Sequence, residues 1–341
     1  MKFETLRFAA KEVHSLCWYG EMLIDWVMGG YGFRMDGSII ESSRRFAYRF
    51  DSATASPDGR FAVIYERAGT KGLLLDNGND IREINRSYYC ANDYEYPVLL
   101  FQNSAGRNLL AHCPERYCQL EIEDAATGER LTASGRRNPA DYFHSQISAS
   151  PSGKRLLVAG WVWHPWSMVQ IFDVANALAD GLHLDNGSSP WPRTRYAQDE
   201  GTACWLDDDT LVIGGTEEIS EVVSPLSPEN GPAPVPKGLA IVNIVTGKGL
   251  RAFQYDEPPG KMFAVGKRHV LSLYRHPKLI DLETGAIVHA WPDIESGLTL
   301  DSISATLREY DPPMAFDRAR NRFAIASGGE IIVVTFHPDQ V

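Results

Sequence analysis

The fold is decided by Ala55-Ser56-Pro57-Asp58-Gly59-Arg60, which runs directly into Phe61-Ala62-Val63-Ile64-Tyr65. Proline fixes φ and glycine accepts positive φ without strain, so Pro57 and Gly59 predict a tight turn. The apolar, β-branched and aromatic run that follows predicts a buried strand. A near copy, Ala149-Ser150-Pro151-Ser152-Gly153-Lys154-Arg155, precedes another apolar run, Leu156–Ala159. The chain therefore contains an internal repeat.

The repeat extends through seven units, each expected to hold strand, tight turn, strand, loop, strand, turn and strand. Their first turns lie near Gly20, Gly59, Gly106, Gly153, Asp208, Gly266 and Arg320. These positions are about 40 to 60 residues apart, close to the length of a four-stranded propeller blade. In the third unit, for example, Glu129–Ala133 is the expected fourth strand.

A spare strand, Lys2–Phe8, precedes the first unit, and the seventh unit lacks one strand. Pairing of Lys2–Phe8 beside Glu330–Phe336 would join the two ends and remove an exposed edge. We therefore expect an all-β, seven-bladed propeller. It has four-stranded antiparallel blades, a ring closed by the N-terminal strand, and a single domain over residues 1–341.

The motifs themselves resemble a known family. Ser56-Pro57-Asp58-Gly59-Arg60 before an apolar strand, with Asp281-Leu282-Glu283-Thr284-Gly285 later, resembles WD40-like and YVTN-type β-propellers. The resemblance extends over nearly the whole chain and implies a fold. It implies no single activity, because propellers of this kind include scaffolds, receptors and enzymes.

Three segments interrupt the repeat, at about 176–201, 215–238 and 292–312. The second contains Ser224-Pro225 and the proline-rich run Pro232–Pro236, which favour a flexible or polyproline-like loop. Long surface insertions often carry binding functions, so these segments are either passive loops or binding elements.

The composition restricts the class of partner. The chain has 341 residues, of which 44% are hydrophobic, and a formal net charge of −11. The negative charge argues against nucleic acid and anionic membranes as partners. It suits either simple solubility or a basic protein partner. The five scattered cysteines, the lack of a long apolar run and the polar start predict a cytoplasmic protein with reduced thiols, which we expect to be bacterial and monomeric on its own.

Acidic and aromatic residues recur in the loops that connect successive units. In a propeller these loops lie on the same face as the loops between the second and third strands of each blade. Carboxylates there would attract Lys or Arg, and aromatic rings would stack on a guanidinium. The predicted partner face comprises Asp93, Tyr94, Glu95, Asp141, Tyr142, Trp163, His164, Trp166, Asp199, Glu200, Asp256, Glu257, Glu309, Tyr310 and Asp311. The alternatives are ordinary polar loop residues or a calcium-binding ring of carboxylates.

Histidines occur in three loops of the same face, at His112, His164 and His276. Such loops could hold a metal ion, but they belong to different units and need not converge. His112 and Cys113 with Cys118 form an incomplete zinc pattern that lacks a second pair of ligands. No nucleophile elbow, phosphate-binding loop or His-Glu-x-x-His motif occurs.

The sequence therefore favours a non-enzymatic, cofactor-free propeller that binds a protein partner, with neutralisation of a basic toxin or effector as one specific form. The main alternative is a metal-dependent hydrolase or lactonase with carboxylates and histidines at the channel mouth. The other alternative is a sensor that binds a small molecule.

Overall fold

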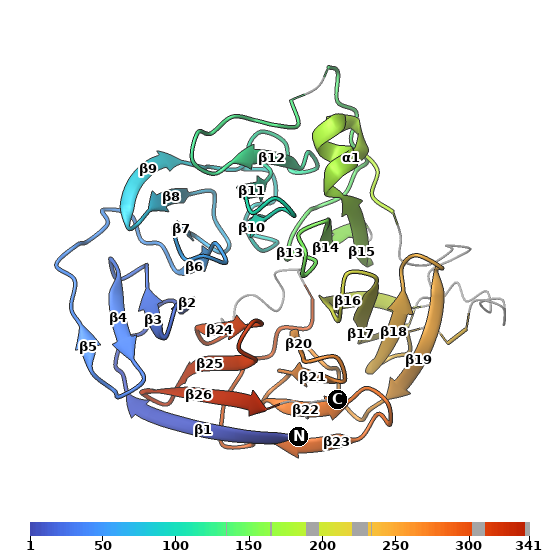
Figure 1. Ribbon diagram of the computed structural model, residues 1–341. Coiled ribbons are helices and arrows are strands. Elements are labelled where there is room, and N and C mark those ends of the chain that lie inside the picture. Colours follow the sequence, from blue (N-terminus) through green and yellow to red (C-terminus); the bar gives the residue numbers. More distant parts are fainter. Residues whose placement is uncertain are drawn as a thin grey trace.

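The computed structural model describes residues 1–133, 135–163, 166–188, 198–219, 231–232, 234–301 and 311–337. Seven antiparallel sheets follow one another along the chain. They lie side by side around a common centre, with β6, β13 and β24 near that centre and β9, β19 and β23 at the periphery (Figure 1). The chain is a seven-bladed β-propeller, as the repeat predicts.

Five blades have four strands each. Blade 1 consists of β2 (Cys17–Tyr19), β3 (Met22–Asp25), β4 (Tyr31–Arg34) and β5 (Ile39–Ile40). Blade 2 consists of β6 (Ser52–Ala55), β7 (Phe61–Tyr65), β8 (Gly72–Asp76) and β9 (Asn79–Glu83). Blade 5 consists of β16 (Gln198–Trp205), β17 (Thr210–Ile219), β18 (Gly238–Asn243) and β19 (Lys248–Gln254). Blade 6 consists of β20 (Met262–Val265), β21 (His269–Ser272), β22 (Lys278–Asp281) and β23 (Ile287–Ala290).

Blade 7 closes the ring. It consists of β24 (Met314–Asp317), β25 (Arg322–Ser327), β26 (Glu330–His337) and the N-terminal strand β1 (Lys2–Ala9). β1 pairs antiparallel with β26 over its whole length, from Lys2 opposite His337 to Ala9 opposite Glu330. The predicted closure is confirmed, and β1 lies along the outer side of β26 in Figure 1.

Blade 3 corrects the expectation of four strands in every blade, whereas in blade 4 residues 189–197, which follow the bridge between Ser188 and Ile171, lie outside the described residues. Among the described residues, both sheets contain three strands each. Blade 3 has β10 (Val98–Gln102), β11 (Asn108–His112) and β12 (Glu121–Asp124), and blade 4 has β13 (Ile147–Ala149), β14 (Arg155–Val162) and β15 (Trp166–Asp173). The segment Glu129–Ala133 is no strand and forms only an isolated bridge between Arg130 and Glu123.

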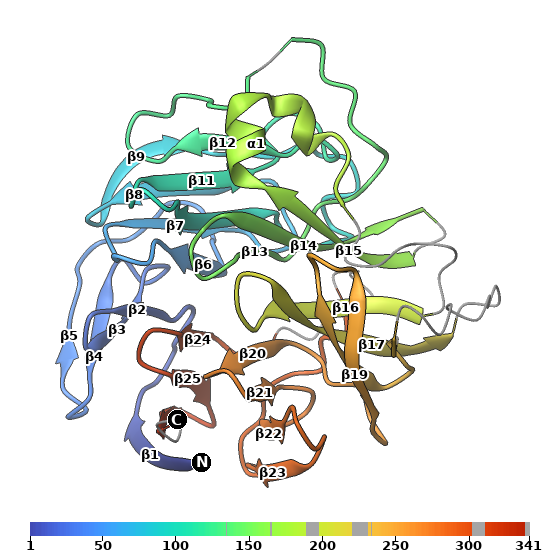
Figure 2. The same cartoon turned by 45° about the vertical axis from the view of Figure 1, so that its right-hand side comes forward.

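In blade 4, a short helix, α1 (Val174–Ala179), and a 3-10 turn, η1 (Gly181–Leu184), follow β15. The Asp173 carboxylate accepts a hydrogen bond from the Asn176 amide and caps α1, which lies outside β15 in both views (Figures 1 and 2). These elements occupy part of the predicted insertion at 176–201. No helix in the described part of the chain is long and apolar enough to cross a membrane.

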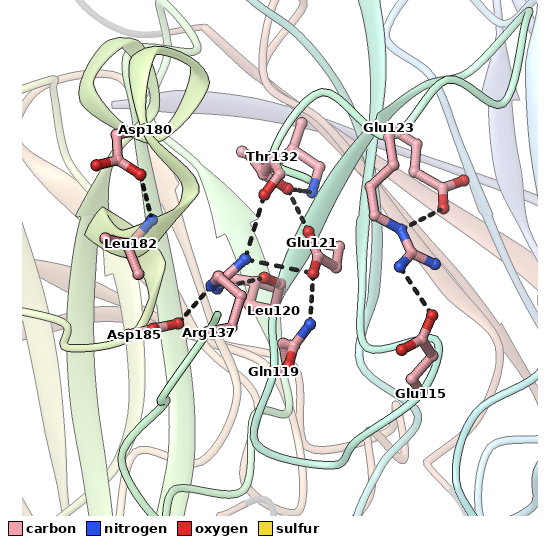
Figure 3. Close-up of polar contacts among 12 residues, drawn as sticks. Glu115, Gln119, Leu120, Glu121, Glu123, Thr132, Arg137, Asp180, Leu182 and Asp185 are labelled. Atoms are coloured by element: carbon pink, nitrogen blue, oxygen red, sulfur yellow. Dashed lines mark hydrogen bonds and ion pairs between the residues drawn. The ribbon is translucent and has the colours of Figure 1, made fainter. Parts of the chain in front are cut away.

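A buried ion network holds the segment of blade 3 where the expected fourth strand does not form. Arg137 donates to the carboxylate of Asp185 beyond η1 at 2.6 Å and to that of Glu121 on β12 at 3.3 Å, and it also reaches the Leu120 and Thr132 carbonyls (Figure 3). All three charged side chains are almost fully buried. Buried charges require such partners, so the chain here follows the ion network instead of a ladder.

The turn that decides the fold has the expected geometry. Gly59 has a φ of +74°, and its amide donates to the Ser56 carbonyl at 2.8 Å. The strand after it, β7, is buried on both faces. Phe61 and Val63 pack toward blade 3, whereas Ala62 and Ile64 pack toward blade 1. The run is continuously apolar because each blade forms a core with both neighbours.

The tight turns between first and second strands also join neighbouring blades. The Asp58 carboxylate accepts hydrogen bonds from Asn108 at 2.7 Å and Gln102 at 3.1 Å, both in blade 3. Arg155 of blade 4 donates to Asp209 of blade 5 at 2.6 Å. This face, which we call the turn face, is thus used for holding the ring together.

Candidate functional site: an aromatic platform on the loop face

The opposite face, the loop face, carries the connections between blades and those between the second and third strands. Five aromatic residues gather there between blades 3 and 4, and we call them the aromatic platform: Tyr89, Tyr117, Phe143, Trp161 and Trp163. They come from four separate loops or strand ends, so only the folded ring brings them together.

The platform has a rigid base and an exposed top. Phe143 and Trp161 are buried and stack face to face, with ring centroids 3.9 Å apart and planes 5° from parallel. Tyr117 stacks on Phe143 at 4.4 Å, and Trp163 stands nearly perpendicular to Phe143 at 5.3 Å. Tyr89 is 48% exposed and Trp163 is 44% exposed. Large aromatic surface is therefore presented to solvent on a preorganised base.

Arg86 positions the loop that carries Tyr89. This buried guanidinium donates to the backbone carbonyls of Gly69, Ala91 and Tyr94 at 2.6, 2.5 and 3.0 Å. It also lies over the rings of Tyr94 and Tyr96, at 4.4 and 5.0 Å from their centroids. Burial lowers the pKa of Arg86, but the carbonyls and rings leave the cation well solvated by the protein. The loop is therefore folded around one cation.

Two acidic residues of the predicted partner face belong to the same loops. Asp141 is exposed, and its carboxylate accepts a 2.6 Å hydrogen bond from the Tyr117 hydroxyl. Partial burial and this carboxylate raise the pKa of Tyr117 above its ordinary value. Asp93 is half-buried, and its amide donates to the Cys90 carbonyl. Within the described ranges, neither aspartate forms an ion pair.

Two further predicted carboxylates, Glu95 and Asp311, are engaged inside the molecule. Glu95 and Asp311 each lie 3.4 Å from the Arg67 guanidinium, and all three are largely buried. Burial opposes the charge on Arg67, but the two carboxylates outweigh it and raise its pKa. Arg67 belongs to blade 2 and Asp311 directly precedes blade 7, so this pairing of non-adjacent blades lies near the ring axis. Two acids of the expected ring are thus largely neutralised.

Further around the ring, Glu200 accepts a hydrogen bond from the Val169 amide at 2.8 Å and so joins blades 5 and 4. Glu257 pairs with Lys278 at 2.9 Å and with Arg275 at 3.5 Å. Asp256 is exposed and forms no ion pair with a described residue. The loop face therefore bears fewer free carboxylates than its sequence implies.

Two further members of the predicted partner face are buried, so the prediction was wrong for them. Tyr94 and Tyr142 are almost completely buried, and the Tyr142 hydroxyl donates to the Val158 and Met168 carbonyls at 3.1 and 2.8 Å. Neither ring offers surface to a partner in this conformation. Trp166, the first residue of β15, is half-buried. His164, Glu309, Tyr310 and the side chain of Asp199 lie outside the described residues.

Two of the three histidines in the predicted constellation, His112 and His276, belong to the described residues. His112 is buried on β11, 3.1 Å from Glu123 of the neighbouring strand. His276 is half-buried in a loop of blade 6. Cys113 and Cys118 are buried, and all five cysteines are free thiols. In the part of the chain that the structure describes, no group of three or more His, Cys, Asp or Glu is arranged to hold a metal ion.

Sequence reasoning missed Tyr89 and Tyr117 as surface residues. The pair Tyr88-Tyr89 shortly before the acidic and aromatic stretch at 92–96 was an available signal. The position of Tyr117 had no such signal, because its contacts with Tyr89 and Phe143 join three different loops.

Comparisons with known proteins support the fold. No protein-family model matches the chain. It is 27% identical over 185 residues to an uncharacterized protein of Acanthamoeba polyphaga mimivirus, covering 49% of this chain and 67% of that one. Among solved structures, it is similar to the Cps50 (Swd1) β-propeller domain of Myceliophteria thermophila. That match has a TM-score of 0.56 and 11% identity over 98% of each chain.

A chain in the crystal structure of the Mitotic Checkpoint Complex is also similar, with a TM-score of 0.61 and 12% identity over 98% of this chain and 93% of that one. At these identities the similarity concerns the fold alone. The resemblance to WD40-like propellers that the turn motifs indicate is thereby confirmed at the level of fold.

Proposed function

We propose that this chain is a non-enzymatic propeller that binds a protein partner through the aromatic platform. The observation that carries the proposal is the exposure of Tyr89 and Trp163 above the buried Phe143–Trp161 stack. Exposed Trp and Tyr side chains dominate the energetics of protein interfaces. Because the rings are already fixed by packing, little conformational entropy is lost on binding.

Two further observations support this proposal. Tight turns on the turn face form hydrogen bonds between blades, whereas the loop face exposes Tyr89 and Trp163. One structurally similar chain was solved as part of a Mitotic Checkpoint Complex, so that propeller assembles with other proteins. We extend this role to the present chain as part of the proposal.

Site-specific photo-cross-linking tests the proposal. A photoreactive amino acid would replace Tyr89 or Trp163, and the matched control would carry it at Tyr19, which is 41% exposed in β2 and adjoins the tight turn of blade 1. In the source cells we expect one discrete protein adduct from positions 89 and 163. Equal labelling from position 19, or no adduct from the platform, would contradict the proposal.

Neutralisation of a basic toxin or effector is the specific form that we propose for this binding. The net charge of −11 suits a cationic partner. The cross-linked partner would have to be basic, and its toxicity in a co-expression assay would have to fall when the propeller is present. An acidic or harmless partner would exclude this form but not the binding role.

Elemental analysis of the purified chain distinguishes a metal-dependent hydrolase from a non-enzymatic, protein-binding propeller. We expect no stoichiometric divalent metal and no change in melting temperature after treatment with a chelator. A bound metal whose removal lowers the melting temperature would favour the hydrolase. A thermal-shift screen against metabolites would similarly test the sensor alternative.

A further inference from the structure

The aromatic platform combines two components that this protein uses repeatedly to hold arginine: an aromatic ring and a carboxylate. On the turn face, the Arg322 guanidinium lies 3.8 Å from the Trp18 ring centroid and pairs with Glu21 and Asp317 at 2.8 and 3.0 Å. A planar guanidinium is suited to this because it stacks on a ring while its N–H groups reach a carboxylate.

The same combination recurs twice more. Arg60 lies over Phe61 at 4.6 Å and pairs with Asp76 at 2.8 Å. Arg44 lies over Phe46 at 5.0 Å and pairs with Asp80. In all three sites the cation comes from the chain itself.

The platform has the ring and the carboxylate, but no described residue supplies the cation. The Asp141 carboxylate accepts a hydrogen bond from the Tyr117 hydroxyl, and the centroid of the Tyr117 ring lies 4.8 Å from that of exposed Tyr89. Trp163 lies 6.4 Å from Tyr89 and nearly perpendicular to it. The neighbouring cation, Arg116, is exposed and interacts with the side chain of Cys118. No described Lys or Arg lies over any of the platform rings.

We infer that the platform binds an arginine side chain of the protein partner, which stacks on Tyr89 or Trp163 and donates to Asp141. This inference rests on the proposed function, since it names the chemistry that the partner presents at the same surface. It also limits the role of net charge. Three acids of the expected ring, Glu95, Glu257 and Asp311, are paired internally, so we assign recognition to one aromatic and acidic site.

A matched pair of peptides tests the inference with the full-length chain. The probes are acetyl-Gly-Ser-Arg-Ser-Gly-amide and the same peptide with citrulline, which keeps the shape of arginine but carries no charge. Binding is followed by titration of the tryptophan indole N–H signals in NMR spectra. We expect the arginine peptide to bind in the millimolar range and about five-fold more tightly than the citrulline peptide.

Three variants test whether the preference for arginine arises at the platform. In Asp141→Asn the amide oxygen can still accept from Tyr117, and we expect the preference for arginine to disappear. In Asp256→Asn, which removes another exposed acid from the loop face, we expect the preference to remain. Trp163→Ala should weaken the binding of both peptides. Because Trp163 is exposed, we expect this variant to stay folded, and its melting curve checks this.

Equal affinity of the two peptides, or an equal effect of Asp256→Asn and Asp141→Asn, would overturn the inference. Neither result would affect the cross-linking test, because a partner could dock on the platform through apolar contacts alone. Conversely, a clear arginine preference without any cellular adduct at positions 89 and 163 would refute the protein-binding role while leaving the site chemistry intact.

Discussion

Two glycines in equivalent turns show how a single residue controls the contact between blades. Gly106 and Gly153 both have positive φ, +75° and +67°. A Cβ atom at Gly106 would meet nothing within 4 Å, whereas at Gly153 it would lie 1.8 Å from the Gln102 carbonyl oxygen of blade 3. The two positions thus share the same backbone requirement but differ in the space around them.

Alanine substitutions separate the cost of the positive φ from the cost of the close contact with blade 3. Gly106→Ala should destabilise by about 1–2 kcal/mol, the cost of placing an L-residue in the left-handed region. Gly153→Ala should cost at least about 3 kcal/mol, because blades 3 and 4 must also move apart. Urea denaturation of both variants measures the difference. Equal midpoints would show that the close approach to Gln102 does not constrain the ring.

His144 is a buried residue whose protonation should affect stability. Burial and, to a smaller extent, nearby Arg137 lower its pKa to about 4, although a hydrogen bond with the Cys118 carbonyl partly opposes the shift. In the unfolded chain a histidine has a pKa of about 6.5. The unfolded state therefore binds the proton more readily, and the folded state loses stability as the pH falls from about 6.5 to about 4.

The variant His144→Gln isolates this contribution. We expect the wild-type free energy of unfolding to fall by up to about 3 kcal/mol across that pH range because of His144. The glutamine variant should show a correspondingly shallower decline, measured by urea denaturation at a series of pH values. Parallel pH profiles for the two proteins would contradict a buried neutral histidine.

At the scale of an element, the outer edge of blade 3 is held by Arg137 where the expected fourth strand does not form. The ion network connects β12 with the chain beyond η1 (Figure 3). The Thr132 hydroxyl donates to Glu121 at 2.5 Å and accepts from the Ile122 amide at 2.9 Å, which places the segment after β12 against the sheet. Side chains here perform the role that a backbone ladder performs in the other blades.

Arg137→Met should leave two buried carboxylates without a counter-ion and destabilise by about 3–5 kcal/mol. Adding Glu121→Gln and Asp185→Asn should recover part of this loss, because neutral amides are cheaper to bury. Arg130→Met is the control, since Arg130 pairs mainly with exposed Glu115 and should cost about 1 kcal/mol or less. Thermal and urea denaturation of the set give these values; similar losses at Arg130 and Arg137 would contradict the role of burial.

For the whole molecule, closure depends on the pairing of β1 with β26. Thr5 lies opposite Val334 and Leu6 opposite Val333. Successive amides in a strand point in opposite directions, so one of these two residues must direct its N–H toward β26. Without β1, the edge of β26 would be open to another chain.

The double variant Thr5→Pro/Leu6→Pro should therefore open the ring. We expect a marked fall in melting temperature and self-association at high concentration, because proline removes the donor and restricts φ. Thr5→Val/Leu6→Val keeps both amides and is the matched control. Light scattering and thermal denaturation compare the two, and a monomeric proline variant with an unchanged melting temperature would show that closure is not needed.

The sequence by itself determined the ring. Turns such as Ser56–Arg60 and apolar strands such as Phe61–Tyr65 are specified by residues within a few positions of each other, so the blades and the closing strand were predictable. The absence of a fourth strand at Glu129–Ala133 of blade 3 was not, because the ion network that holds this edge joins Arg137 to Asp185, far along the sequence.

Only the tertiary structure decided which loop residues are available to a partner. Arg67 neutralises Asp311 across 244 positions of sequence, and Tyr94 and Tyr142 are buried by distant segments. Tyr89, Tyr117 and Trp163 meet because separate loops converge on one face. Exposure and charge pairing depend on such long-range contacts, which no local pattern of residues encodes.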